Sequence, residues 1–293
     1  MVSRPSRSRA CPRWTRRLFV EGEARVDAQD RIPVVVVGAN GRMGRETVET
    51  VLQQVDLELV AAVGHARDLG EDVGVLTTGE ACGVTLSNDL EAALAAASGG
   101  VLVDFSLGHA VKNTVLAALA RDVACVVGAT AIPGTDEAEM SEAAGKTPLL
   151  IAPNFALGAV LMMQFARQAS KYFRWAEIIE FHHEKKVDAP SGTARRTADL
   201  MRRARSDGFR AAPEGDESLK DCRGGSIGGL RIHSVRLPGL LAHQEVIFGA
   251  QGETLTIRHD ARSRESYMPG VLLAIRKVRS LTGCVIGLEN LVD

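Results

Sequence analysis

Two adjacent histidines and two adjacent lysines lie in one short stretch of the chain, His182-His183-Glu184-Lys185-Lys186. Imidazole gains and loses protons near neutral pH, so the histidines are candidates for acid–base chemistry. The stretch continues to Ser191-Gly192-Thr193, and a helix-like sequence follows over residues 195–205. The N–H groups at a helix N-terminus attract anions, as lysines do. Residues 180–194 therefore predict a site that binds and protonates a small anionic substrate.

The histidines also have a structural explanation. Adjacent residues of an extended segment point to opposite faces, so at most one of His182 and His183 enters a given pocket directly. Because lysines and a Ser-Gly-Thr turn lie beside them, we favour a functional role for the pair. We interpret three histidines in strand-like segments as structural residues with satisfied hydrogen bonds: His233, His243 and His259. No spacing suggests a metal site, and we expect no metal.

The residues that follow the histidines divide between solvent and site. Most lysines lie at the surface, and we expect this of Lys185. Lys186 stands just before Asp188-Ala189-Pro190, and we expect it to contact substrate. Asp188 either orients a neighbouring cation or begins a turn, and we favour the turn. Ser191 and Thr193 are also typical helix N-caps, and capping uses the same N–H groups that bind anions.

A glycine-rich turn forms the second candidate site. The apolar run over residues 34–37 leads to Gly38, Gly41 and Gly44, and helix-like sequence follows. In a strand–turn–helix unit these glycines allow a tight turn, close approach to a diphosphate, and close packing of helix on strand. An ordinary turn is the alternative. The position after the first of several strands favours dinucleotide binding.

The end of the second expected strand bears on which nicotinamide cofactor is used. Dinucleotide folds commonly place a carboxylate there to bind the ribose hydroxyls. Here the run over residues 59–63 is followed by Gly64-His65-Ala66-Arg67-Asp68, with no carboxylate at the strand end. Two basic side chains, His65 and Arg67, would tolerate a 2′-phosphate, so we expect NADPH or NADH. The alternatives are that both are solvated, or that Asp68 is a displaced ribose ligand.

The elements that position these sites follow two patterns. Up to about residue 154, short apolar runs alternate with helix-like sequence, which indicates a parallel sheet covered on both faces. The expected strands are 34–37, 59–63, 101–105, 123–127 and 149–152, and the expected helices are 42–54, 89–97, 110–121 and 136–144.

The second pattern begins near residue 157 and indicates an antiparallel or mixed sheet. We expect a loop over 206–229, helices over 157–172 and 271–281, and strands over 176–181, 231–237, 243–248, 254–259 and 284–288. We predict an α/β fold with a doubly wound, parallel-sheet Rossmann domain over residues 31–155, on which 265–293 pack back. A C-terminal α+β substrate-binding domain is expected over 156–264.

Composition limits the function classes. The chain has 293 residues, a net charge of −1 and 45% hydrophobic residues, so we expect no dedicated nucleic-acid binding. No apolar run approaches the roughly 20 residues that cross a bilayer, so no membrane partner is expected.

Residues 1–30 differ in composition from the rest. Six arginines precede any acidic residue: Arg4, Arg7, Arg9, Arg13, Arg16 and Arg17. No apolar core of signal-peptide length is present, so secretion is not expected. An organelle transit peptide and a disordered basic tail are both consistent with this composition. We expect a cytoplasmic protein if the source is bacterial, and a plastid protein if the leader is a transit peptide.

With these motifs in place, the chain from about Ile32 to its C-terminus resembles the dihydrodipicolinate reductase (4-hydroxy-tetrahydrodipicolinate reductase) family of the diaminopimelate route to lysine. The resemblance rests most on His182-His183 through Thr193, and also on Gly38-Ala39-Asn40-Gly41-Arg42-Met43-Gly44, Val103-Asp104-Phe105-Ser106 and Pro153-Asn154-Phe155. The segment from Arg231 to Glu245 looks like the form found in cyanobacteria and photosynthetic lineages.

The resemblance implies NAD(P)H-dependent reduction of a small cyclic dicarboxylate, usually by a homotetramer. It implies that His182 is the acid/base and Lys186 the proton donor. It implies that the substrate is bound by His183, Lys186, Ser191, Gly192 and Thr193, with Arg264 near the substrate and the interdomain hinge. The implied cofactor residues are Gly38, Arg42, Met43, Gly128, Thr130, Asn154 and Phe155, to which the motifs above add Gly41, Gly44 and His65.

Two loops depart from the family pattern. The family's Gly-Thr-Thr-Gly is replaced by Gly128-Ala129-Thr130-Ala131, and the extra methyl at Ala131 restricts the backbone beside the nicotinamide. The family's Thr-x-Pro is replaced by a segment that begins at Ser106. Two alternatives therefore stay open: another Rossmann oxidoreductase that acts on a small acid, such as an amino-acid dehydrogenase, and a non-catalytic nucleotide-binding homologue.

Overall fold

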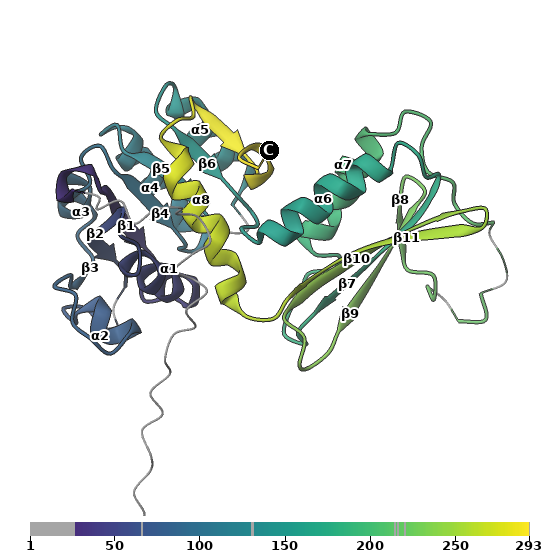
Figure 1. Ribbon diagram of the computed structural model, residues 1–293, viewed down its shortest axis with the longest axis horizontal. Coiled ribbons are helices and arrows are strands. Elements are labelled where there is room, and N and C mark those ends of the chain that lie inside the picture. Colours follow the sequence, from purple (N-terminus) through teal and green to yellow (C-terminus); the bar gives the residue numbers. More distant parts are fainter. Residues whose placement is uncertain are drawn as a thin grey trace, which may run out of the picture.

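The computed structural model describes residues 27–65, 67–129, 132–213, 215, 217–219 and 221–292. Most of the basic leader, together with Thr130 and Ala131, lies outside these ranges. Within them the chain forms two sheets that lie side by side (Figure 1). No helix of this part of the chain is long and apolar enough to cross a membrane.

The first sheet has seven parallel strands in the order β12-β6-β5-β4-β1-β2-β3. Its strands are β1 (Ile32–Val37), β2 (Leu57–Val63), β3 (Leu86–Ser87), β4 (Val101–Asp104), β5 (Ala124–Val127), β6 (Leu149–Ile151) and β12 (Cys284–Ile286). The strand order reverses between β1 and β4, and a crevice opens at such a point beyond the carboxyl ends of the strands.

Helices cover both faces of this sheet because its strands are apolar on both sides. Val34 and Val36 face α1 (Arg42–Leu52) and α8 (Met268–Val278), while Val35 and Val37 face α3 (Leu90–Ala96), α4 (Gly108–Leu119) and α5 (Gly134–Ala144). A short helix, α2 (Val73–Thr77), precedes β3. The expected doubly wound parallel sheet is confirmed.

The second sheet is mixed, with the order β11-β10-β7-β9-β8. Strands β7 and β9 run parallel, and the other neighbours are antiparallel. The strands are β7 (Trp175–His182), β8 (Gly225–Ile227), β9 (Leu230–Arg236), β10 (Ala242–Ala250) and β11 (Glu253–Ala261). Helices α6 (Leu157–Ala169) and α7 (Gly192–Arg203) cover one face, where Ile178, Val246 and Phe248 are buried against Ala198 and Met201.

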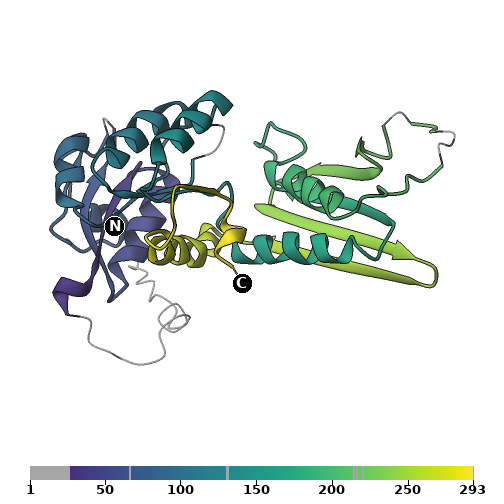
Figure 2. The same cartoon turned by 90° about the horizontal axis from the view of Figure 1, so that it is seen from above.

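Three 3-10 helices complete the described secondary structure: η2 (Ala28–Asp30), η3 (Arg264–Tyr267) and η4 (Leu288–Asn290). The chain passes from β6 to α6, and returns from β11 through η3 to α8. Figure 2 shows α8 back against the first sheet while α6 extends along the second. The η3 segment therefore joins the two sheets at the end of β11.

The expected loop over residues 206–229 is wrong in its last part, where β8 forms. Ile227 pairs with Leu230 across Gly228 and Gly229, whose φ angles are 56° and 87°. Two consecutive residues with positive φ make the tight turn that joins the strands of a hairpin. The Gly-Gly pair is a hairpin signal that the charged, glycine-rich surroundings obscured.

Candidate active site

A buried carboxylate lies two residues before His182 on the same face of β7. The Glu180 side chain is fully buried, and its Oε2 lies 2.5 Å from His182 Nδ1. Arg236, the cross-strand neighbour of His182 on β9, donates to both oxygens of Glu180 at 2.8 Å. The Ser191 amide donates to Oε1 at 3.2 Å. This network fixes the imidazole through Nδ1, which leaves Nε2 for a ligand.

The hydrogen bonds around Glu180 keep it ionised. Burial raises the pKa of this carboxyl, but hydrogen bonds from His182, Arg236 and Ser234 outweigh burial and hold the pKa at about 2. A buried carboxylate that accepts several charged and polar donors favours its charged form. Glu180 is therefore an ionised carboxylate, and in this form it orients His182.

Arg236 also ties the lysine loop to this network. Its guanidinium donates to the backbone oxygen of Asp188 at 2.7 Å and to that of Lys186 at 3.3 Å. Lys186 Nζ lies 2.8 Å from both Asp188 oxygens, and this bond lowers the pKa of the Asp188 carboxyl. Of the two alternatives for Asp188, the structure supports the one that was not favoured, because its side chain holds the neighbouring Lys186 cation.

The N-terminus of α7 lies beside the same carboxylate. Ser191 is its N-cap, and its hydroxyl accepts from the Ala194 amide at 3.2 Å. Thr193 Oγ1 accepts from Asn154 Nδ2 at 3.1 Å, and Asn154 Oδ1 accepts from the Ala156 amide at 2.8 Å, at the start of α6. The first N–H groups of a helix lack partners within it, so this end can hold an anion.

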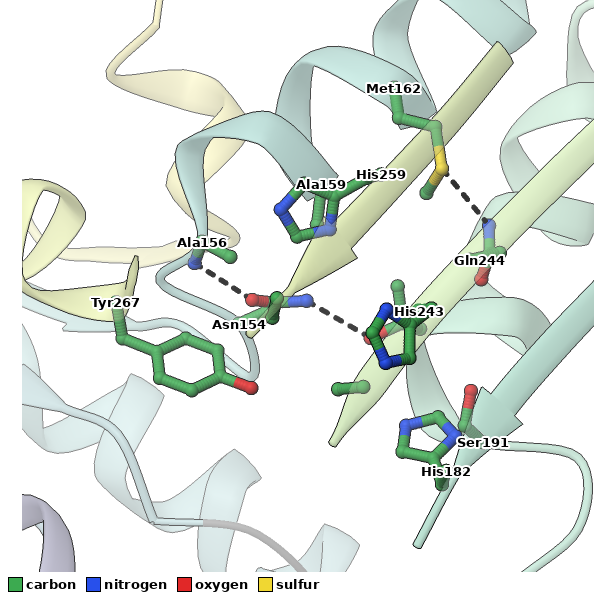
Figure 3. Close-up of a pocket in the computed structure, with 13 residues that line it drawn as sticks. Asn154, Ala156, Ala159, Met162, His182, Ser191, His243, Gln244, His259 and Tyr267 are labelled. Carbon is green, nitrogen blue, oxygen red and sulfur yellow. Dashed lines mark hydrogen bonds between the residues drawn. The ribbon is translucent and has the colours of Figure 1, made fainter. Parts of the chain in front are cut away.

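A cavity that is open to solvent joins these elements. His182 and Ser191 lie together on one side of it, and Tyr267 lies on the opposite side (Figure 3). The other lining residues come from the segment before α6, from α6 itself, from the start of α7 and from the two long strands: Asn154, Ala156, Ala159, Met162, Thr193, Ala242, His243, Gln244, His259 and Ala261. The cavity therefore lies at the end of the second sheet nearest the first, where η3 returns.

The three histidines interpreted as structural differ in their surroundings. His233 lies 2.8 Å from Glu177, and His243 lies 2.7 Å from Asp260 while its Nε2 accepts from the Leu241 amide. These two are confirmed as satisfied.

His259 is the exception among the three. It has no hydrogen-bond partner among the described residues and lines the cavity, where burial lowers the pKa of its imidazole. A Cβ on Gly158 would come within 2.5 Å of this ring, so only glycine fits there.

The glycine turn after β1 has the expected geometry. Gly38 has φ of 74°, and a Cβ on Gly44 would come within 2.0 Å of the Gly38 oxygen. The first and third glycines therefore serve the tight turn and the close packing of α1 on β1. A Cβ on Gly128 would come within 2.1 Å of the Phe105 ring, which packs edge-on against Phe155.

Unpaired polar atoms lie at the point where the strand order reverses. Asp104 ends β4 beside β1, and its Oδ1 accepts from the Ser106 amide at 2.7 Å. Asp104 Oδ2 and Ser106 Oγ are buried and without a partner in the described residues. Together with the glycine turn, these atoms fit a polar dinucleotide at this crevice.

The loop after β2 is held in place without a carboxylate at the strand end. Asn40 Nδ2 donates to the backbone oxygens of Arg67 at 2.8 Å and His65 at 3.2 Å. Asp68 Oδ2 pairs with Arg45 at 2.8 Å. His65 is exposed, and the Arg67 side chain is 83% exposed.

The structure brings some predicted site residues together and leaves others apart. His182, Ser191, Thr193 and Asn154 line the cavity, whereas His183 and Lys186 do not. Arg264 lies in η3, which contacts α1. Thr130 lies outside the described residues. Among these residues no group of three or more His, Cys, Asp or Glu side chains is suited to a metal ion.

Sequence reasoning gave no role to Glu180, Arg236, Gln244 or Tyr267. The signal for Glu180 was its spacing of two from His182, which places both on one face of a strand. Arg236 and Gln244 join the site only through strand pairing.

Comparison with known proteins identifies relatives of the whole described fold. The family models described as "Dihydrodipicolinate reductase, N-terminus" and "Dihydrodipicolinate reductase, C-terminus" match residues 32–155 and 158–292. The 4-hydroxy-tetrahydrodipicolinate reductase of Desulfitobacterium hafniense is 48% identical over 90% of this chain and 99% of its own, and that of Synechocystis sp. is 47% identical over the same shares. A dipicolinate-bound dihydrodipicolinate reductase from Paenisporosarcina sp. has a TM-score of 0.78 at 38% identity, covering 89% of this chain and 99% of that one.

Proposed function

The chain belongs to the dihydrodipicolinate reductase family, and we propose that it catalyses the NAD(P)H-dependent reduction of 4-hydroxy-tetrahydrodipicolinate to tetrahydrodipicolinate in the diaminopimelate route to lysine. The observation that carries the proposal is the cavity in which His182, oriented by Glu180, lies beside the N-terminus of α7. This places a proton carrier next to an anion-binding helix end.

The substrate's carboxylates fit the N-terminus of α7. Ser191, Gly192 and Thr193 offer first-turn amides and hydroxyls there, and these donors match a carboxylate. The solved relative from Paenisporosarcina sp. binds dipicolinate, a planar dicarboxylate of the same ring size. We propose His183, directly after β7, and Arg264 in η3 as further substrate ligands, and Arg264 approaches when the two sheets close on the ligand.

The reaction replaces a ring hydroxyl by hydrogen. Water leaves the ring, hydride adds to the unsaturated carbon that results, and a proton completes the product. The reduced nicotinamide, when bound, supplies the hydride. His182 exchanges protons through Nε2 because Nδ1 is held by Glu180. Lys186 donates a proton once a substrate carboxylate replaces Asp188 as its partner.

The cofactor fits the first sheet. Gly38, Gly41 and Gly44 let the turn pack closely on its own backbone at the N-terminus of α1, and the unpaired atoms of Asp104 and Ser106 lie at the same crevice. Arg42 and Met43 open α1, and Phe105 links the loop at Gly128 to Phe155. We propose these residues, with His65, Thr130 and Asn154, as the cofactor site.

One assay tests the proposed function. Purified protein is mixed with freshly prepared 4-hydroxy-tetrahydrodipicolinate and either NADPH or NADH, and nicotinamide absorbance is followed. We expect oxidation of the cofactor that depends on the dicarboxylate. Binding of NADPH without turnover would favour a non-catalytic homologue, and turnover of amino or keto acids instead would favour a different dehydrogenase.

Replacing Lys186 by alanine is expected to lower kcat about 100-fold, the usual scale for a lost proton donor. Lys185→Ala is the matched control, because Lys185 is exposed and its neighbour carries the ion pair with Asp188. Steady-state kinetics of both variants measure the effect. Equal rates for the two would assign Lys186 to loop structure alone.

Replacing Arg67 by alanine is expected to raise the KM for NADPH about fivefold and leave the KM for NADH unchanged. The physical reason is that an exposed guanidinium next to the ribose site contributes a charge-assisted hydrogen bond to a 2′-phosphate and nothing to a 2′-hydroxyl. The ratio of the two KM values is the measurement. A parallel rise for both cofactors would show that the loop has been disturbed instead.

We propose a homotetramer assembled through the face of the second sheet opposite α6 and α7. Within the described residues no helix covers that face, and it carries the partly buried Ile179 and Phe181 and the half-exposed Trp175. We further propose a substrate-binding role for residues 156–264, cofactor binding by 31–155 with 265–293, and a cytoplasmic location in a bacterial source or a plastid one if the leader is a transit peptide.

A further inference from the structure

Gln244 places a buried, unpaired acceptor in the wall of the cavity. Its side chain is 3% exposed and lines the cavity from β10. Its Nε2 donates to Thr197 Oγ1 at 2.8 Å and approaches Met162 Sδ at 3.8 Å (Figure 3). Its Oε1 is buried and has no partner in the described residues. A buried acceptor without a donor is costly to folding, so such an atom commonly serves a ligand.

The orientation of the Gln244 amide is fixed by Thr197. The Thr197 hydroxyl has one proton, and it donates to the Thr193 backbone oxygen at 2.8 Å, one turn earlier in α7. Thr197 Oγ1 can therefore only accept from Gln244. A flipped amide would set two acceptors against each other, so the oxygen is the atom left for the cavity.

The surroundings decide what kind of group this oxygen can meet. The carboxylates of a ligand seek donors, and the donors lie at the N-terminus of α7, where Ser191 and Thr193 line the cavity. An amide oxygen repels a carboxylate and attracts an O–H or N–H group. Gln244 therefore faces the part of the ligand between or beyond its carboxylates, which is the ring.

We propose that Gln244 Oε1 accepts a hydrogen bond from a donor carried by the ring of the bound dicarboxylate, and that it thereby selects hydroxylated ligands over those without a donor. This inference rests on the proposed function for the ring dicarboxylate. It makes Gln244 a specificity-determining residue whose amide orientation is fixed by Thr197.

Calorimetric binding to the NADPH-saturated protein tests this without turnover. Three ligands are compared: dipicolinate, 4-hydroxypyridine-2,6-dicarboxylate, which adds one donor in either tautomer, and 4-methoxypyridine-2,6-dicarboxylate, which has similar bulk and no donor. Wild type is expected to bind the hydroxy ligand about tenfold more tightly than the methoxy ligand. Gln244→Met, which preserves shape, is expected to bring that ratio to about one with little change for dipicolinate.

Thr197→Val provides the second variant, because it removes the lock on the amide without touching Gln244. We expect an intermediate ratio of about three. Dipicolinate affinity reports that the second sheet of each variant is folded, and NADPH affinity reports the same of the first sheet, which carries the glycine turn. An unchanged ratio in Gln244→Met and Thr197→Val, or an equal loss for all three ligands, would overturn the inference. Failure of wild type to bind any of the three would instead contradict the proposed function.

Discussion

Replacing His182 by glutamine is expected to lower kcat about 10²- to 10⁴-fold, the range that a positioned acid–base group contributes. Glutamine keeps a hydrogen bond to Glu180 but cannot carry a proton to the ligand. His182 is the residue at which a titratable nitrogen, a cavity and a buried carboxylate 2.5 Å away coincide. Steady-state kinetics with saturating NADPH and substrate measure the loss.

His233→Gln is the matched control for this experiment. His233 lies on the same sheet and also contacts a carboxylate, Glu177 at 2.8 Å, but does not line the cavity. Its replacement is expected to change kcat less than twofold, because glutamine preserves the bond to Glu177. A His182→Gln enzyme as fast as the control would remove His182 from the mechanism and leave Lys186 as the proton carrier.

The choice between the two histidines shows where sequence reasoning stops. Strand alternation predicted that only one of His182 and His183 enters the pocket, and this rule needs no structure. Deciding which one requires the buried face of β7. That face carries Ala176, Ile178 and Glu180, so it continues to His182. When a glutamate falls on the buried face of a strand whose other residues are apolar, sequence alone does not predict that it is buried. That prediction requires its cationic partner to be known.

The partner of Glu180 could not be found from sequence because it is not local. Arg236 is 56 residues away, and the parallel pairing of β7 with β9 brings it opposite His182. Gln244 meets Thr197 across 47 residues because α7 packs on the face of the second sheet. The Rossmann half was easier to predict, because each strand, turn and helix carries its own local pattern.

Two short edge strands escaped prediction for a related reason. β3 has two residues and β8 three, too few for a period of two to appear. Their positions depend on neighbouring strands and on the glycine turn at Gly228-Gly229. Short edge strands are specified by pairing and turn geometry more than by their own composition.

The second large effect is expected from Arg236→Met. This change removes the guanidinium from a fully buried carboxylate and should lower the free energy of unfolding by about 3–5 kcal/mol at pH 7. It also frees the backbone oxygens of Lys186 and Asp188, so kcat should fall at least about tenfold. Chemical denaturation and steady-state kinetics measure the two losses.

Arg258→Met is the matched control on the same sheet. Arg258 bonds two carboxylates, Glu245 and Asp260, but its side chain is 46% exposed. Exposed ion pairs contribute about 1 kcal/mol or less, so this variant should stay near wild type in stability. A similar loss of unfolding free energy in both variants would show that pairing with the buried Glu180 stabilises the fold no more than an exposed ion pair does.

The pH dependence separates the charge of Arg236 from its packing. The pKa of Glu180 in the folded protein, about 2, lies below its ordinary value of 4.5, so the network stabilises the fold above about pH 4.5. This contribution is lost as the pH falls through the folded value. The stability difference between wild type and Arg236→Met should therefore be smaller at pH 3 than at pH 7.

The double variant Glu180→Gln with Arg236→Met should be more stable than Arg236→Met alone at pH 7, because no unpaired buried charge remains. If the stability difference between wild type and Arg236→Met is the same at pH 3 and pH 7, the guanidinium acts through packing. Glu180 would then be kept ionised by groups other than Arg236.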